Sequence, residues 1–296
     1  MASARLVLAA DDVVGESIIW APQEAQLYWV DIVGSRIHRL DPATGAHRLW
    51  ETPELPTSIG LRRSGGFIVG LRQRVTFWQP DGPFETFAVP EPDKPGNRLN
   101  EGVVAPDGSF WVGTMQDNIN PDRSPKDMTA SIGALYRIAP GGNVTQLTDA
   151  DFGITNTMVW TDDGRFITAD TLKNTLYVYD YDERAKRLSN RRIFAELDRA
   201  LPDGSARDAA GSVYNCRVVG GSAVARLAPD GTLLGYLDLP CASPTSCTFG
   251  GPELKTLYVT SSRFGLTEDE RRARPQEGSL FAIDTNWTGA ASNVFG

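Results

Sequence analysis

Carboxylate and amide side chains recur at one position of a repeated pattern in this 296-residue sequence. In each copy a polar residue opens a short apolar stretch that runs into a turn and a second apolar stretch. The residues at this position are Glu16, Ser58, Asn100, Asn156, Asp203 and Ser246. Carboxylate and amide oxygens that converge on one point are the ligands that hard divalent cations prefer. We therefore predict that Glu16, Asn156 and Asp203 bind one divalent metal ion, with water completing its coordination.

The turn that follows this position is well defined in several copies. Asp107-Gly108 and Asp163-Gly164 stand between two apolar stretches, and glycine tolerates the positive φ that a tight turn between strands requires. Two copies are degenerate at the turn, at Gln23-Glu24 and Glu253-Leu254. The six copies follow one another at intervals of about forty to fifty-five residues, a period typical of propeller blades. The sequence thus predicts an all-β protein, a six-bladed β-propeller with a central channel.

A second set of strands completes each blade. Their alternating apolar and polar residues are typical of half-buried strands. They cover residues 35–40, 74–78, 133–138, 174–179, 222–227 and 278–283. Fourth strands such as 144–147 have weaker patterns. Residues 5–9 precede Glu16 as residues 144–147 precede Asn156, so we expect this N-terminal strand to complete the last blade and close the ring. Nothing indicates a linker, and residues 1–296 are predicted to form a single domain.

Alternating strand direction places the candidate site on one face of the propeller. The residue that opens each innermost strand should lie at the mouth of the channel, and the tight turns should lie on the opposite face. The two long loops 116–132 and 263–277 are expected beside the channel mouth, where they would form walls or a lid. Taken singly, Asn100 or Asn156 could cap a turn and Glu16 could be an exposed loop carboxylate. Their shared position in the repeat favours a functional site.

Composition and charge restrict the possible partners and compartment. The net charge of −8 and the pI near 4.9 argue against nucleic acid or an anionic membrane as a partner. No apolar run approaches the length of a membrane span, and residues 6–10 are too short for a signal-peptide core. The three cysteines have no paired spacing, so we expect reduced thiols in a cytoplasmic protein. His38 and His47 fall in and beside an outer strand, which leaves a Ser-His or Cys-His mechanism without a base.

The sequence resembles the gluconolactonase/regucalcin family of six-bladed propeller lactonases. The resemblance covers nearly the whole chain and is carried by Gly15-Glu16 with Leu27-Tyr28-Trp29-Val30-Asp31-Ile32, Arg98-Leu99-Asn100-Glu101-Gly102 with Gly113-Thr114-Met115, Ile154-Thr155-Asn156, and Pro202-Asp203-Gly204. It implies a divalent metal held by Glu16, Asn156 and Asp203, with Asp203 also acting as the proton acceptor. An all-oxygen ligand set favours Ca²⁺, with Zn²⁺, Mn²⁺, Mg²⁺ or Fe²⁺ as alternatives.

The resemblance also implies which residues contact the substrate. Arg98 and Asn100 would contact the hydroxyls or the lactone, although the residues alone leave open whether Arg98 is merely a solvated loop side chain. Glu101 stands where the family usually has Asp, and Asn118 falls near a substrate-contacting Glu of regucalcin-like members. Residues 215–221 replace a segment that is often aromatic. We include Glu101 and Asn118 among the candidate substrate-binding residues.

The expected activity is metal-dependent hydrolysis of a sugar-acid lactone to the aldonic acid, in carbohydrate catabolism. No organic cofactor is needed, and the expected partner is a small lactone, with the protein a monomer or a small homo-oligomer. Two alternatives remain open at this point. One is a phosphotriesterase-like hydrolase on a similar propeller, and the other is a non-catalytic, calcium-binding scaffold, because propellers host many unrelated functions.

Overall fold

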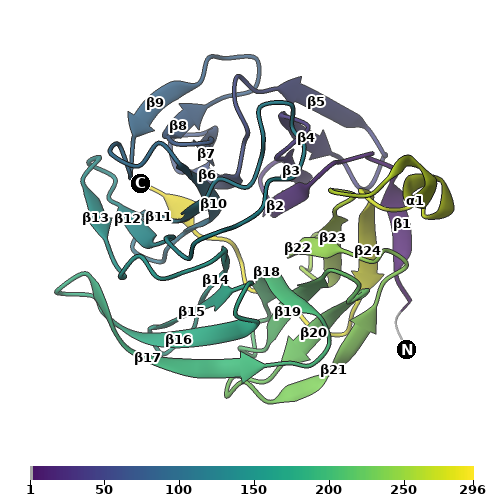
Figure 1. The fold of residues 1–296 in the computed structure, drawn as a ribbon. Helices are drawn as coiled ribbons and strands as arrows, with labels where there is room; N and C mark the ends of the chain where they lie inside the picture. The colour runs from purple at the N-terminus through teal and green to yellow at the C-terminus, as the bar shows by residue number, and fades with distance from the viewer. Residues whose placement is uncertain (1–2) are drawn as a thin grey trace.

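The chain folds into six antiparallel sheets arranged round a central axis, as predicted (Figure 1). The computed structural model describes residues 3–296. The first blade comprises β2 (Gly15–Ala21), β3 (Gln26–Asp31), β4 (Arg36–Leu40) and β5 (His47–Glu51). The second comprises β6 (Ser58–Arg62), β7 (Phe67–Gly70), β8 (Val75–Trp78) and β9 (Glu85–Ala88). The third comprises β10 (Asn97–Val104), β11 (Phe110–Gln116), β12 (Leu135–Ile138) and β13 (Val144–Gln146).

The remaining blades follow the same order, and the last one closes the ring. The fourth comprises β14 (Thr155–Trp160), β15 (Arg165–Asp170), β16 (Thr175–Asp182) and β17 (Arg187–Glu196). The fifth comprises β18 (Leu201–Arg207), β19 (Val213–Val218), β20 (Ala223–Leu227) and β21 (Leu233–Asp238). The sixth comprises β22 (Pro244–Gly250), β23 (Thr256–Ser261), β24 (Leu280–Asp284) and the N-terminal β1 (Arg5–Leu8). Because β1 pairs antiparallel with β24, Leu6 opposite Phe281, the predicted closure is confirmed.

Burial explains why some strands are easier to recognise than others. The second strand of a blade lies between neighbouring strands and neighbouring blades, so every residue of β7 and β19 is buried. Trp29, Trp111 and Tyr214 on such strands are at most 1% exposed, and they belong to the core as expected. The outermost strands have one solvated face. In β5 four of the five residues are exposed, which accounts for the weak apolar pattern of fourth strands.

Two elements extend this plan. The C-terminal strand β25 (Val294–Phe295) pairs in parallel with β6, Val294 opposite Leu61, and adds a fifth strand to the second blade. Figure 1 shows the C-terminus inside the ring, next to β10 and β11. The predicted loop 263–277 contains a short helix, α1 (Glu268–Ala273), whose start is capped by Thr267 and Glu270.

Strand register separates the two faces as predicted. Arg98 pairs with Met115 at the start of β10, and Pro244 pairs with Ser261 at the start of β22. The segments that follow β11 and β23 therefore lie on the face where the inner strands begin. The tight turns lie opposite, and Gly108 has φ +75 there. In the degenerate turns, Ala25 and Leu254 adopt positive φ values of 54 and 53 without the freedom of glycine.

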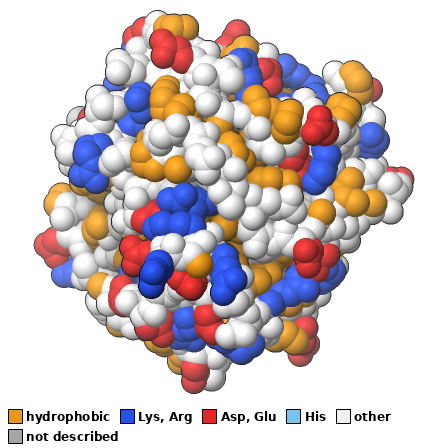
Figure 2. Space-filling view, turned by 90° about the vertical axis from the view of Figure 1, so that its left-hand side faces the viewer, with side chains coloured by type: hydrophobic (Ala, Val, Ile, Leu, Met, Phe, Trp, Pro, Cys, Tyr) orange, Lys and Arg blue, Asp and Glu red, His pale blue; other side chains and the backbone are white. Residues whose placement is uncertain are grey.

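The surface, the cysteines and the two histidines bear on the predictions about partners and chemistry. On the side shown in Figure 2, Lys and Arg side chains are interspersed with Asp and Glu. Within residues 3–296 no helix is long and apolar enough to cross a membrane. The three cysteines are free and buried: Cys216, Cys241 and Cys247. His38 and His47 bond to each other through Nδ1 and Nε2 (2.9 Å) in the outer strands of the first blade, away from the inner strands.

Candidate active site

Three buried carboxylates from three blades lie within electrostatic reach of one another along the central channel. Glu16 is on β2, Glu101 on β10 and Asp203 on β18. The side chains of Glu16 and Asp203 are close enough for either carboxyl, when protonated, to donate to the other. Backbone N–H groups also donate to two of them, that of Ser17 to Glu16 Oε2 (3.0 Å) and that of Gly102 to Glu101 Oε1 (3.2 Å). The sequence predicted the meeting of Glu16 and Asp203; it placed Glu101 with the substrate contacts.

The environment of these carboxylates opposes their ionisation. Burial raises the pKa of Glu16 to about 7, against the opposing effects of the Ser17 N–H and the Arg98 charge. Burial and then the charge of Glu16 raise the pKa of Glu101 to about 8. Burial, followed by the charges of Glu16 and Glu101, raises the pKa of Asp203 well above its ordinary value. Buried like charges either keep protons or require a positive charge beside them.

The donor set fits a divalent cation. The carboxylates of Glu16 and Asp203 are adjacent, and Asn156 brings an amide oxygen from the neighbouring inner strand β14. Oxygen-rich sets of this kind suit hard cations, and a cation would relieve the repulsion that raises both pKa values. In residues 3–296 no three or more His, Cys, Asp or Glu side chains form a metal-binding group. A metal held here would therefore need the Asn156 amide as well as the two carboxylates.

A chain of hydrogen bonds connects Arg98 to Asn156. Arg98 Nη1 donates to Asn100 Oδ1 (2.7 Å), and Asn100 Nδ2 donates to Asn156 Oδ1 (3.0 Å). On the other side, Nε and Nη2 of Arg98 both donate to Asn118 Oδ1 (3.1 and 2.9 Å). Arg98 is 6% exposed, so it is not a solvated loop side chain. Four of the predicted residues thus form one network that reaches from the loop after β11 to the channel.

The Arg98 guanidinium also carries the positive charge of the site. Burial lowers its pKa to about 10, and the carboxylates of Asp117, Glu16 and Asp203 partly oppose that shift. Its ordinary pKa lies so high that it remains cationic near neutral pH. Four of its five N–H groups donate to Asn118, Asn100 and the Leu99 carbonyl. Arg98 therefore brings a fixed charge to the acidic group at the channel mouth and keeps one Nη2 N–H for a substrate.

Backbone irregularities in the inner strands place these side chains. In β2 the register jumps between Glu16, opposite Val30, and Ile19, opposite Tyr28, so β2 contains one extra residue. The same extra residue occurs in β10, β14, β18 and β22, each time at the repeated polar position. Ser17 and Thr157, which follow two of these positions, have positive φ values of 51 and 50. Such bulges interrupt the alternation of side chains and turn them in new directions.

Several supporting residues had no signal in the repeat. Thr157 Oγ1 and Asn215 Nδ2 both donate to the Asp203 carbonyl, the latter at 3.0 Å. Arg217 donates through Nη1 to Asn215 Oδ1 (2.8 Å) and is fully buried, so this part of segment 215–221 supports Asp203 from behind. In the other loop, Arg72 Nε donates to Asp117 Oδ2 (2.7 Å). Asn215 and Arg217, polar and charged residues on the second strand β19, had that position as their sequence signal; Thr157 and Arg72 had none.

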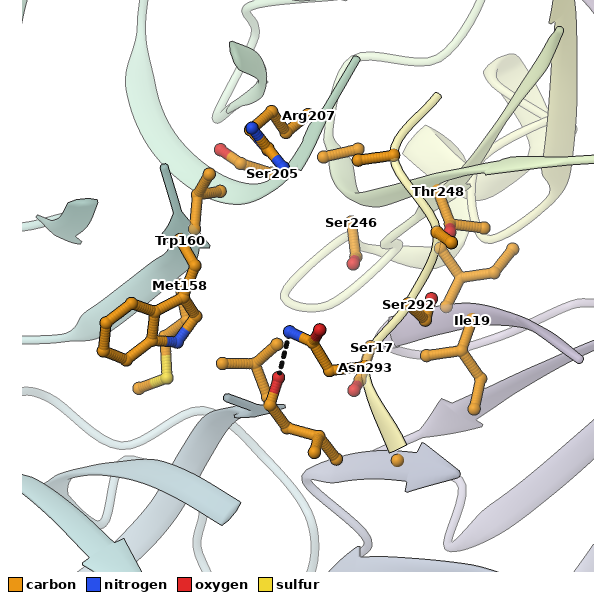
Figure 3. A pocket seen from close by; sticks show the side chains of 18 of the residues that line it. Ser17, Ile19, Met158, Trp160, Ser205, Arg207, Ser246, Thr248, Ser292 and Asn293 are labelled. Carbon is orange, nitrogen blue, oxygen red and sulfur yellow. Dashed lines mark hydrogen bonds between the residues drawn. The ribbon is translucent and has the colours of Figure 1, made fainter. Parts of the chain in front are cut away.

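The channel opens into a cavity on the opposite side of the site. This cavity has a volume of about 420 Å³ and is lined by the inner strands and by residues 290–293. Figure 3 shows the Ser246 hydroxyl turned toward its interior, whereas the Ser17 and Ser205 hydroxyls bond to the Ile59 N–H and to Thr157 in the wall. Glu101 belongs to its lining, whereas Asn100 belongs to the network above. The bulge in β10 thus sends two adjacent side chains to different ends of the channel.

The comparisons with known proteins identify the family of the chain. Residues 14–263 match the family described as SMP-30/Gluconolactonase/LRE-like region. The chain belongs to this family. The resemblance inferred from the motifs around Glu16, Asn100, Asn156 and Asp203 is therefore confirmed.

Individual relatives cover almost the whole chain. The chain is 35% identical over 295 residues to a 6-deoxy-6-sulfogluconolactonase from Pseudomonas putida, and the match covers 98% of each chain. It is 35% identical over 285 residues to a pentonolactonase from Haloferax volcanii, covering 93% of this chain and 92% of the relative. The structure of a calcium-binding protein, regucalcin, from Agrobacterium tumefaciens superposes with a TM-score of 0.91 at 26% identity, covering 100% and 98% of the two chains. These relatives place the chain in a family of sugar lactonases.

Proposed function

We propose that this protein hydrolyses the lactone of a sugar acid to the open-chain acid, with a divalent cation bound by Glu16, Asn156 and Asp203. The observation that carries this proposal is the buried pair of carboxylates, Glu16 and Asp203, facing the Arg98 guanidinium at one end of the channel. Such a site offers ligands, a base and hydrogen-bond donors at one point. The names of the relatives, a sulfogluconolactonase and a pentonolactonase, support the substrate class.

The residues of the chain have separate tasks in this reaction. A bound divalent cation would supply Lewis-acid chemistry that polarises the lactone carbonyl. Asp203 accepts the proton of the attacking water, because it is the buried carboxylate next to Glu16 and the proposed cation would keep it ionised, as a base must be. Water adds to the acyl carbon, the ring C–O bond breaks, and the ring oxygen takes a proton to become a hydroxyl. The new carboxylic acid then ionises and releases a proton to solution.

Arg98 and Asn100 hold the substrate in this scheme. Arg98 presents its charge and its remaining Nη2 N–H at a fixed angle, because Asn118 and Asn100 hold the guanidinium from two sides. Fixed donors that align the polyol raise the rate by removing unproductive orientations. Asn100 in turn holds the Asn156 amide oxygen, so substrate position and ligand position are coupled through one side chain.

Calcium is the metal that we propose to test first. The proposed ligands are all oxygens, which Ca²⁺ prefers, and the matching structure from Agrobacterium tumefaciens is described as a calcium-binding protein. Loading the chelated protein with Ca²⁺, Mg²⁺, Mn²⁺ or Zn²⁺ in turn would identify the ion that restores activity.

A pH-indicator assay tests the proposed function directly. Each lactone opened at neutral pH releases one proton, so a panel of aldonolactones, with and without chelator, reports both activity and metal dependence. We expect hydrolysis of at least one lactone that chelator abolishes and a divalent cation restores. Hydrolysis of a phosphotriester panel without lactone turnover would replace the proposal with the phosphotriesterase alternative. Calcium binding with no turnover of either panel would favour a non-catalytic scaffold.

A further inference from the structure

A second cavity lies on the face where the inner strands begin, between the fifth and sixth blades. It has a volume of about 500 Å³. Its walls come from the segment after β19, the segment between β21 and β22, and the end of α1 with the residues that follow it. All three segments are loops of the face that carries the candidate active site. None of the predicted site residues lines this cavity.

A buried carboxylate with an open acceptor forms part of the wall. Glu277 is 6% exposed, and its Oε1 accepts a hydrogen bond from the Ala242 N–H (2.7 Å). Its other oxygen, Oε2, is buried and has no hydrogen-bond partner among residues 3–296. Burial and then the negative charge of Glu277 raise the pKa of the neighbouring Cys241 thiol to about 12. A buried carboxylate oxygen without a donor is energetically unfavourable and usually marks a missing partner.

The backbone holds Glu277 in this position. The Glu277 N–H donates to the Arg274 carbonyl (3.2 Å), and the Gly278 carbonyl accepts from the Asp12 N–H (2.9 Å). Gly278 has φ +76, and a Cβ there would lie 2.2 Å from the Asp12 carbonyl oxygen. The backbone at Glu277 is therefore fixed, and the hydrogen bond from the Ala242 N–H holds its carboxylate in the cavity wall, so we look for the partner of Oε2 in the cavity.

Arg274, which also lines this cavity, restricts the kinds of ligand that could be the partner of Glu277 Oε2. Its side chain is exposed and forms no ion pair within the described chain. Arg274 and Glu277 line the same cavity, and a cavity with one positive and one negative side chain disfavours a metal ion. It favours a ligand that combines a hydroxyl donor, for Glu277, with an anionic group, for Arg274. We propose that this cavity binds a small hydroxy acid, whose hydroxyl donates to Glu277 Oε2 and whose carboxylate pairs with Arg274.

The proposed function suggests which hydroxy acid to use. An aldonic acid, the product of lactone hydrolysis, carries both groups, and this choice of ligand rests on the proposed function. The cavity would then retain or sense product on the same face as the active site. The hydrogen-bonding argument for Glu277 and Arg274 stands without that reaction.

Gluconate is the probe for the test, with amide hydrogen exchange of residues 219–222, 239–243 and 273–277 as the readout. We expect gluconate to protect these segments, and neutral glucose to protect them far less. Glu277→Gln keeps an acceptor for Ala242 but offers an N–H₂ group where the ligand needs an acceptor. It should weaken gluconate binding about tenfold or more, the effect expected of a lost hydrogen bond to a charged group. Arg274→Ala should weaken binding as well.

Arg271→Ala is the matched control. Arg271 lies in α1, close in sequence to Arg274 at the end of that helix, but it does not line the cavity. It should leave gluconate protection unchanged. Thermal unfolding of each variant checks that the fold is intact, and Arg274→Ala carries the test if Glu277→Gln fails to fold. No protection by gluconate at millimolar concentration, equal protection by glucose, or unchanged binding in Arg274→Ala would each overturn the inference. Absence of lactone turnover in the unaltered protein would instead count against the proposed function and leave this result standing.

Discussion

Arg98→Ala separates substrate positioning from metal binding at the candidate site. The Arg98 side chain donates to three acceptors: Asn118 Oδ1, Asn100 Oδ1 and the Leu99 carbonyl. Truncation removes all of these donors and the positive charge beside Glu16. It leaves the proposed metal ligands chemically intact. We expect kcat/KM for the preferred lactone to fall while the bound metal is retained.

The structure sets the size of that fall. A hydrogen bond from a charged donor contributes about 1.5–3 kcal/mol, which corresponds to roughly tenfold to 150-fold in kcat/KM. Asn100 also loses the Nη1 donor that orients its amide, which adds to the loss. A total on the order of a hundredfold or more follows. Metal affinity should not fall, because removing a cation from this group makes the potential at the ligands more negative.

Steady-state kinetics and elemental analysis of the same purified samples measure the two effects. Arg98→Lys keeps the charge without the planar fork, so it should retain the metal, as Arg98→Ala does, and recover kcat/KM only in part. Asn118→Ala keeps Arg98 but removes one of its supports, and a smaller fall is expected. Unaltered kcat/KM in Arg98→Ala would refute the positioning role. Loss of the metal in that variant would refute the division between ligands and positioning residues.

Three further predictions concern the ligands, an ion pair and the turns. Glu16→Gln and Asp203→Ala should both lose bound metal, measured by elemental analysis, and activity, measured by the lactone assay. Full metal occupancy in either variant would contradict the ligand assignment. Burial opposes ionisation of Asp107, but donors from Ser109 and Arg137 outweigh it and lower the pKa to about 2. Ionised Asp107 stabilises the fold above its ordinary pKa, and this contribution is lost as pH falls from about 4 to 2. The difference in free energy of unfolding between the native protein and Asp107→Asn, measured in urea, should therefore shrink over that range. Ala25→Gly should raise and Gly164→Ala should lower the free energy of unfolding by about 1 kcal/mol, because both positions have positive φ. Nothing lies within 4 Å of a Cβ at Gly164, so unchanged Tm values would contradict a backbone effect.

Much of the fold was accessible from the sequence because its signals are local. Tight turns such as Asp107-Gly108 and continuous apolar strands such as Phe67–Gly70 depend on neighbours in the chain. Their repetition fixed the number of blades, and the position of residues 5–9 in that repeat identified the closing strand. Elements outside the repeat were missed for the same reason. The two-residue strand β25 is defined only by pairing with β6, and it has no periodicity of its own.

The candidate site was predictable where a role follows from position in the repeat. Glu16 and Asp203 occupy equivalent positions in different blades, and the structure places them together. The residues that hold them do not share that position. Thr157, Asn215 and Arg72 act through contacts with residues far away in the sequence, as when Arg72 reaches across 45 residues to Asp117. No local pattern indicates which distant carbonyl or carboxylate such a side chain will meet.

The extra residue in five of the inner strands connects the fold to the chemistry. In a regular strand, Asn100 and Glu101 would simply face opposite sides of the sheet. The bulge instead places Asn100 in the network with Arg98 and Asn156. It places Glu101 in the lining of the 420 Å³ cavity at the other end of the channel, within electrostatic reach of Glu16. A carboxylate at this position therefore interacts with Glu16 from the cavity end of the channel without occupying a proposed ligand position. The blades supply a rigid frame, and the bulges decide which oxygens face the channel mouth and which face its opposite end.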